Sequence, residues 1–150
     1  MNDPLGIRMV DVGGKEPSLR TARASARLRA APETIHRIRT GGLDKGDAVA
    51  TARLAAVMAA KRTSDIVPLC HPLPLDAVGC EIGFEADAIV IETVVRTTAR
   101  TGVEMEALVA ASAAALTIYD MSKSIDRGMT IEQVRLEEKT GGTRGDWRRA

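Results

Sequence analysis

The segment Ala22-Arg-Ala-Ser-Ala-Arg-Leu-Arg29 alternates small apolar residues with arginine and serine. A period of two places the apolar side chains on one face of an extended chain and the polar side chains on the other. The segment therefore predicts a β-strand with one buried face and a basic outward face.

Two helices are predicted directly after this strand. Pro32 suits the first turn of a helix over residues 32–39, and Gly41-Gly42 would end it. Asp47 can cap a second helix, from Ala48 to about Arg62, because its carboxylate accepts free backbone N–H groups. This second helix is apolar almost all round, so we expect other elements to cover most of its sides.

The middle of the chain predicts a stiff loop and a hairpin. Three prolines make residues 65–75 extended, because proline fixes φ and removes a hydrogen-bond donor. Residues 76–85 and 88–98 are predicted to be two strands joined at Ala86-Asp87. The prolines are Pro68, Pro72 and Pro74.

The longest predicted helix begins at Thr101 and ends near Ile125. Thr101 and Glu104 have the spacing of a capping box, in which each side chain bonds the other residue's backbone. The uncharged run Ala107–Tyr119 has 13 residues, fewer than the roughly 20 that span a bilayer. We therefore expect a buried helix and no membrane partner.

The order of these elements predicts the fold class. Residues 129–137 form a last strand, 9–12 a possible edge strand, and 139–146 a glycine-rich basic tail. The element order is strand, helices, strand, strand, helix, strand. This order predicts an α+β, ferredoxin-like antiparallel sheet with helices packed on one face. A length of 150 residues suits one domain over 1–150.

Composition argues against several classes of partner. A net charge of +1 and only three aromatic residues do not favour binding to nucleic acid. An alanine-rich core buries little area per residue, so we expect an oligomer. The first ten residues lack the apolar stretch of a secretory signal, which predicts a cytoplasmic protein with free thiols at Cys70 and Cys80.

Asp120 and Lys123 lie three apart on the long helix and are therefore neighbours. The two residues could be an ordinary surface ion pair. Alternatively, the Asp120 carboxylate and the Lys123 ammonium could transfer protons in a reaction. Glu104 is explained by the capping box, whereas Glu106 is not. Because Glu106 and Asp120 are about 21 Å apart along a helix, they serve different purposes or meet only across two subunits.

Other polar residues permit weaker hypotheses. Cys70 and His71 with Cys80 poorly support a zinc site, because metal-ligand spacing is missing. His71 is better explained as a rigidly held hydrogen-bonding residue, and His36 as a surface residue. Lys45 near a helix N-terminus and the Lys139–Arg144 tail could bind phosphate, although neither matches a Walker motif.

In combination, several segments resemble the cyclic pyranopterin monophosphate synthase family (molybdenum cofactor biosynthesis protein C) over residues 9–147. The matching segments are Met9–Val12, Lys45–Asp47, Ala50–Arg53, Ala59–Thr63, Ile66–Leu73, Thr101–Leu108 and Ala114–Met121 with Lys123.

The resemblance implies conversion of 3′,8-cyclo-7,8-dihydroguanosine triphosphate into cyclic pyranopterin monophosphate with release of diphosphate. It implies no redox cofactor, although magnesium could accompany the triphosphate. It also implies a homohexamer, a trimer of dimers with sites between subunits, and a possible contact with the radical enzyme upstream. The implied roles are catalysis for Asp120, Lys123 and Lys45, and substrate binding for Leu69, Cys70, His71, Met105, Glu106, Glu104, Arg20 and Lys139.

Two positions depart from the family pattern. Ser122 replaces a frequent cysteine, and Thr143-Arg144 stands where relatives often carry lysine and a small residue. The alternative function is a non-catalytic ferredoxin-like module that binds a small anion between subunits.

Overall fold

The structure is a computed structural model and describes residues 6–150. Its helices are α1 (Pro32–Arg39), α2 (Ala48–Lys61), α3 (Thr63–Ile66) and α4 (Glu104–Ser122). Its strands are β1 (Ser18–Arg29), β2 (Ala77–Phe84), β3 (Ala88–Ala99), β4 (Thr130–Thr140) and β5 (Trp147–Arg148).

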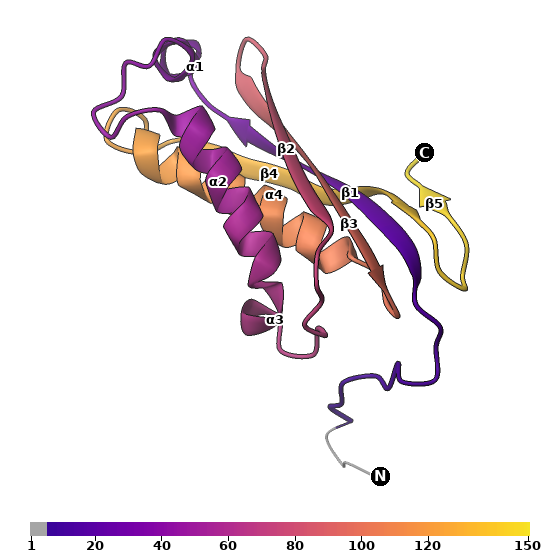
Figure 1. The fold of residues 1–150 in the computed structure, drawn as a ribbon. Helices are drawn as coiled ribbons and strands as arrows, with labels where there is room; N and C mark the ends of the chain where they lie inside the picture. Colours follow the sequence, from indigo (N-terminus) through magenta and orange to yellow (C-terminus); the bar gives the residue numbers. More distant parts are fainter. Residues whose placement is uncertain (1–5) are drawn as a thin grey trace.

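The five strands form one antiparallel sheet in the order β2-β3-β1-β4-β5. Helix α4 packs on β1, β3 and β4, and α2 packs on β2 and α4, so both lie on the same face of the sheet (Figure 1). This topology confirms the predicted ferredoxin-like α+β fold. Strand β5, which was not predicted, pairs Trp147 and Arg148 with the end of β4.

Strand β1 lies between β3 and β4, with its four apolar side chains buried, as the alternation predicts. The outward face carries Arg23, Arg27 and Arg29, as predicted, and carboxylates pair with these arginines. Arg23 Nη2 lies 3.6 Å from Glu92 Oε2, and Arg27 Nη1 lies 2.8 Å from Glu85 Oε2. A carboxylate on β3 and one directly after β2 therefore balance these arginines.

The helix layer consists largely of alanine. Every fourth residue of α2, from Ala48 to Ala60, is buried, and α4 contributes five buried alanines. Small side chains let the two helices approach closely. The prediction that α2 is covered on most sides is wrong for this chain alone, because Leu54 and Met58 are 60% and 46% exposed.

The predicted capping box at Thr101 is wrong. Helix α4 begins at Glu104, after Val103, and its N-cap has no side-chain hydrogen bond. The Glu104 carboxylate instead lies 3.5 Å from Lys139 Nζ. The helix also ends at Ser122 rather than near Ile125.

Two loop segments also differ from prediction. Residues 9–12 form no strand, and the Val10 carbonyl lies 2.7 Å from the His71 ring, outside the sheet. Residues 65–66 belong to the short helix α3, and the extended loop begins after them. Among residues 6–150, no helix is long and apolar enough to span a bilayer.

Candidate functional site

A carboxylate and two lysines meet at the C-terminal end of α4. Lys45 Nζ lies 2.9 Å from Asp120 Oδ2, and Lys123 Nζ lies 2.9 Å from Asp120 Oδ1. Lys45 also donates to the Asp120 backbone carbonyl at 3.3 Å. Asp47 caps α2 by accepting from the Ala50 N–H, and this fixes the helix start three residues after Lys45.

The Asp120 cluster (Lys45, Asp120 and Lys123) is about half exposed. Hydrogen bonds from Lys45 and then Lys123 lower the pKa of the Asp120 carboxyl. The cluster therefore carries two ammonium groups against one carboxylate, on an open surface. Such a group can receive an anion or exchange a proton with it.

A pocket of about 370 Å³ lies at the opposite end of α4. Its wall includes three consecutive residues of the proline-rich loop, and Met105 completes it from the start of the helix. The His71 ring lies 2.7 Å from the Val10 carbonyl, on the N-terminal segment that also lines the pocket. The loop residues are Leu69, Cys70 and His71.

A smaller, cationic pocket of about 180 Å³ adjoins the first one. The two share Lys15, Thr101, Gly102 and Glu104, so they form one continuous depression. The second pocket adds Arg20, Lys139 and Arg144. Its four cations face a single carboxylate, that of Glu104, which makes this part of the depression suited to a polyanion.

Backbone geometry holds Arg20 in place at this pocket. Arg20 is 7% exposed, and its Nε donates to the Ala99 carbonyl at 3.1 Å. The tail crosses it at Gly142, which has a φ of +90°. A Cβ there would lie 2.5 Å from Arg20 Nη1, so the crossing requires glycine.

Glu106 lies beneath this region and is almost fully buried. The Cys70 thiol donates to Glu106 Oε2 at 3.7 Å. Burial raises the pKa of Glu106, and burial together with Glu106 raises the pKa of Cys70 to about 11. Cys70 and Glu106 are therefore neighbours, although they are 36 residues apart.

The structure divides the residues proposed from sequence into two groups. Arg20, Lys139 and Glu104 join the loop and Met105 around the continuous depression, with Glu106 behind Cys70. The Asp120 cluster lies about 24 Å away, 16 residues along α4. His71 therefore does not meet Lys45 and Lys123 within one chain.

Sequence reasoning missed Lys15, which lines both pockets. A single lysine after Gly13-Gly14 matches no sequence motif that would indicate a binding residue. Only the fold reveals its place, because the Arg100 Nε donates to the Lys15 carbonyl across 85 residues.

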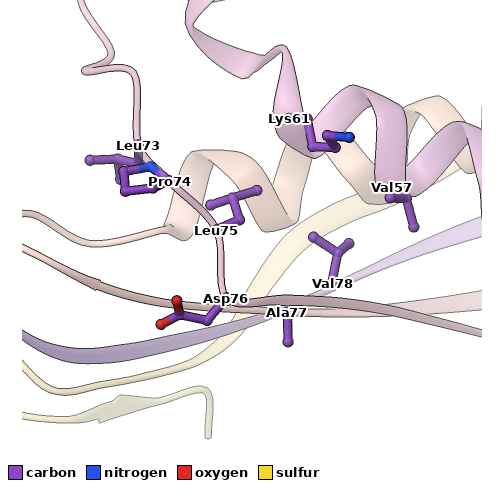
Figure 2. A pocket seen from close by; sticks show the side chains of 8 residues that line it. All are labelled: Val57, Lys61, Leu73, Pro74, Leu75, Asp76, Ala77 and Val78. Atoms are coloured by element: carbon purple, nitrogen blue, oxygen red, sulfur yellow. The ribbon is translucent and has the colours of Figure 1, made fainter.

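A separate cavity of about 430 Å³ lies between the end of α2 and the start of β2 (Figure 2). Six of its eight lining residues have apolar side chains, and Lys61 and Asp76 are its charged residues. None of the residues proposed from sequence lines it. Within residues 6–150, no three histidine, cysteine or acidic side chains gather in a way that could hold a metal ion.

Comparisons with known proteins identify relatives over nearly the whole chain. The MoaC family model matches residues 9–142. The chain is 55% identical to the cyclic pyranopterin monophosphate synthase of Streptomyces coelicolor over 95% of this chain and 84% of the relative. It is also 55% identical to that of Herpetosiphon aurantiacus (98% and 91%) and 53% identical to that of Novosphingobium aromaticivorans (95% and 91%). These names are those of an enzyme, so the non-catalytic alternative is not favoured.

Proposed function

Because the chain belongs to the MoaC family, we propose that it converts 3′,8-cyclo-7,8-dihydroguanosine triphosphate into cyclic pyranopterin monophosphate in molybdenum cofactor biosynthesis. The purine-derived ring is opened and rebuilt, and a cyclic phosphate forms as diphosphate leaves. The main structural support is the continuous depression, in which an apolar pocket adjoins a cationic one.

Each half of the depression suits one half of this substrate. The fused ring would lie against Leu69, His71 and Met105 in the larger pocket. The triphosphate would extend into the smaller pocket, where Arg20 and Lys139 face it together with Lys15. Arginine and lysine are the usual ligands of phosphate groups.

The Asp120 cluster would supply the chemistry. A breaking phosphoanhydride gains negative charge, and fixed cations stabilise that charge. Lys45 and Lys123 can do this and can also transfer protons, while Asp120 holds both ammonium groups in one place. Magnesium bound to the triphosphate would enter as part of the substrate, and we propose no resident cofactor.

We propose that a second copy of the chain brings the Asp120 cluster to the depression. About 24 Å separates the two along one helix, which is too far for a single substrate to contact both. Exposed apolar residues on both long helices, Leu54, Met58 and Leu116, support an assembly. A homohexamer built as a trimer of dimers is the arrangement we propose. Contact with the upstream radical enzyme and a cytoplasmic location also stay predictions.

Mass spectrometry of the purified protein incubated with the cyclised triphosphate tests this function. Diphosphate and a pterin cyclic phosphate should appear together, and the Asp120→Ala variant should form neither at a comparable rate. If the wild-type protein forms no product from this substrate, the proposed function is wrong.

A further inference from the structure

The carboxylate of Asp126 joins the start of α1 to the segment that follows α4. Its Oδ2 accepts from the Ala31 N–H at 3.1 Å and from the Thr34 hydroxyl at 3.0 Å, across 95 and 92 residues of sequence. Its Oδ1 accepts from the Gly128 N–H at 3.1 Å. The Asp126 N–H in turn donates to the Ser122 carbonyl at 3.1 Å, at the last residue of α4. One residue of this chain therefore connects two helices and the turn before β4.

Asp126 provides a cap that the N-cap residue of α1 cannot provide. This N-cap residue is Ala31, and alanine has no side chain that could accept a hydrogen bond from the first turn. A carboxylate at a helix N-terminus also interacts favourably with the helix dipole. Asp126 is half-buried and Thr34 is buried, so these hydrogen bonds are partly shielded from water. The start of α1 is thus fixed to the end of α4.

The two lysines of the Asp120 cluster lie on the two segments that Asp126 connects. Lys123 is the C-cap residue of α4, three residues before Asp126. Lys45 lies in the loop that joins α1 to α2. The distance between the backbones of the two lysines therefore depends on how α1 is held against the end of α4.

The side chains of the cluster hold this geometry only weakly by themselves. Asp120, Lys45 and Lys123 are each about half exposed, and exposed ion pairs restrain long side chains little. Reacting groups are kept in place by the elements beneath them. We propose that Asp126 is a positioning residue of the Asp120 cluster. By capping α1 from the end of α4, it keeps both ammonium groups within reach of one carboxylate.

An NMR titration of Asp120 tests this role without any reaction. Hydrogen bonds from Lys45 and Lys123 lower the pKa of Asp120 in the wild-type protein. In Asp126→Ala both pairs should loosen, and the pKa of Asp120 should rise towards its ordinary value of 3.8. Thr34→Val removes one of the hydrogen bonds to the Asp126 carboxylate and should give a smaller rise. A wild-type Asp120 pKa in Asp126→Ala would overturn the proposal.

Ser25→Ala is the matched control for Thr34→Val. The hydroxyl of Ser25, on β1, donates to Glu137 Oε1 on β4 at 2.6 Å, so this variant also loses a part-buried hydrogen bond. It should lower stability and yet leave the pKa of Asp120 unchanged. An equal rise of this pKa in the control would mean that any loss of stability disturbs the cluster, and would reject a specific role for Asp126.

A kinetic test rests on the proposed function. Asp126→Ala should lower kcat about tenfold and keep KM within about threefold, because the cluster supplies the chemistry whereas the depression binds most of the substrate. The loss should be smaller than in Asp120→Ala, since the Tyr119 hydroxyl still donates to the Arg127 carbonyl at 3.0 Å in the same segment. A wild-type kcat in Asp126→Ala would contradict the proposal.

Two milder variants decide the question if Asp126→Ala does not fold. Asp126→Asn keeps one acceptor oxygen, and Thr34→Val keeps the shape of the side chain. Each should raise the pKa of Asp120, and a wild-type value in both would overturn the proposal. Absence of wild-type turnover would reject the proposed function and leave the titration valid.

Discussion

Lys45 Nζ and Asp120 Oδ2 lie 2.9 Å apart although 75 residues separate them in the chain. The contact joins the loop before α2 to the end of α4. Lys123 occupies the other carboxylate oxygen at the same distance. One carboxylate thus fixes two ammonium groups, and this arrangement carries the catalytic part of our proposal.

Removal of this carboxylate should abolish most turnover without unfolding the protein. Asp120→Ala should lower kcat about a hundredfold or more, because both lysines lose their common anchor. The midpoint of thermal unfolding should change little, since exposed ion pairs contribute little to stability. Glu92→Gln, which removes an exposed ion pair with Arg23 on the sheet, should affect neither quantity. A similar loss of activity in both variants would contradict this role.

Loss of Lys45 should raise the pKa of Asp120. The two lysines hold this pKa below its ordinary value of 3.8. The two ion pairs therefore stabilise the fold at pH values above the pKa of Asp120 in the unfolded chain. This contribution is lost as the pH falls through the pKa of Asp120 in the folded protein. In Lys45→Gln, an NMR titration should place the Asp120 pKa closer to the ordinary value. Lys61→Gln, at the other end of α2, should leave it unchanged.

Glu106 should make stability depend on pH in the opposite sense. Because burial raises its pKa above the ordinary value of 4.5, its contribution to stability is complete below that value and is lost as the pH rises through the folded pKa. Glu106→Gln should therefore gain stability relative to wild type at neutral pH. Urea unfolding at two pH values measures this: the difference should vanish below the ordinary pKa, and an equal difference at both would contradict the assignment.

Two glycines of the tail provide a matched pair. Gly142 and Gly145 both have positive φ, but only at Gly142 would a Cβ meet Arg20. Alanine at either position should destabilise the fold by about 1 kcal/mol through backbone strain. Only Gly142→Ala should also raise KM, by about tenfold, because it displaces the guanidinium from the cationic pocket. Equal KM values in the two variants would remove Arg20 from the substrate site.

Local patterns predicted the elements well where one interaction decides the structure. The alternation in residues 22–28 predicted β1, because only an extended strand places all of its alternating apolar side chains on one buried face. Asp47 was correctly predicted as a cap, since its carboxylate has no competing cation in the structure's ion pairs. Thr101 and Glu104 had an equally good capping pattern, but Lys139, 35 residues away, attracts the glutamate.

The site was less predictable because its contacts are long-range. The spacing of three residues on a helix correctly predicted that the side chains of Asp120 and Lys123 would meet. Other contacts depend on how segments that are distant in the chain cross each other. These are the contact of Lys45 with Asp120, the approach of Gly142 to Arg20, and the position of Lys15 in the two pockets. The sequence spacing did predict that α4 would keep its two ends apart, since helix rise fixes that distance.

The central claim is that one active site takes its depression from one chain and its Asp120 cluster from another. Co-assembly of two inactive variants, Asp120→Ala and Lys139→Ala, tests it most directly. Random mixing should restore about a quarter of the wild-type sites, because a site is intact only when the Asp120→Ala chain supplies its depression and the Lys139→Ala chain supplies its cluster. A mixture of Asp120→Ala with Lys45→Ala should restore none, because both changes lie in the same cluster. Recovery of roughly that fraction is the predicted result. No recovery, with subunit exchange confirmed by differently tagged chains, would contradict the account.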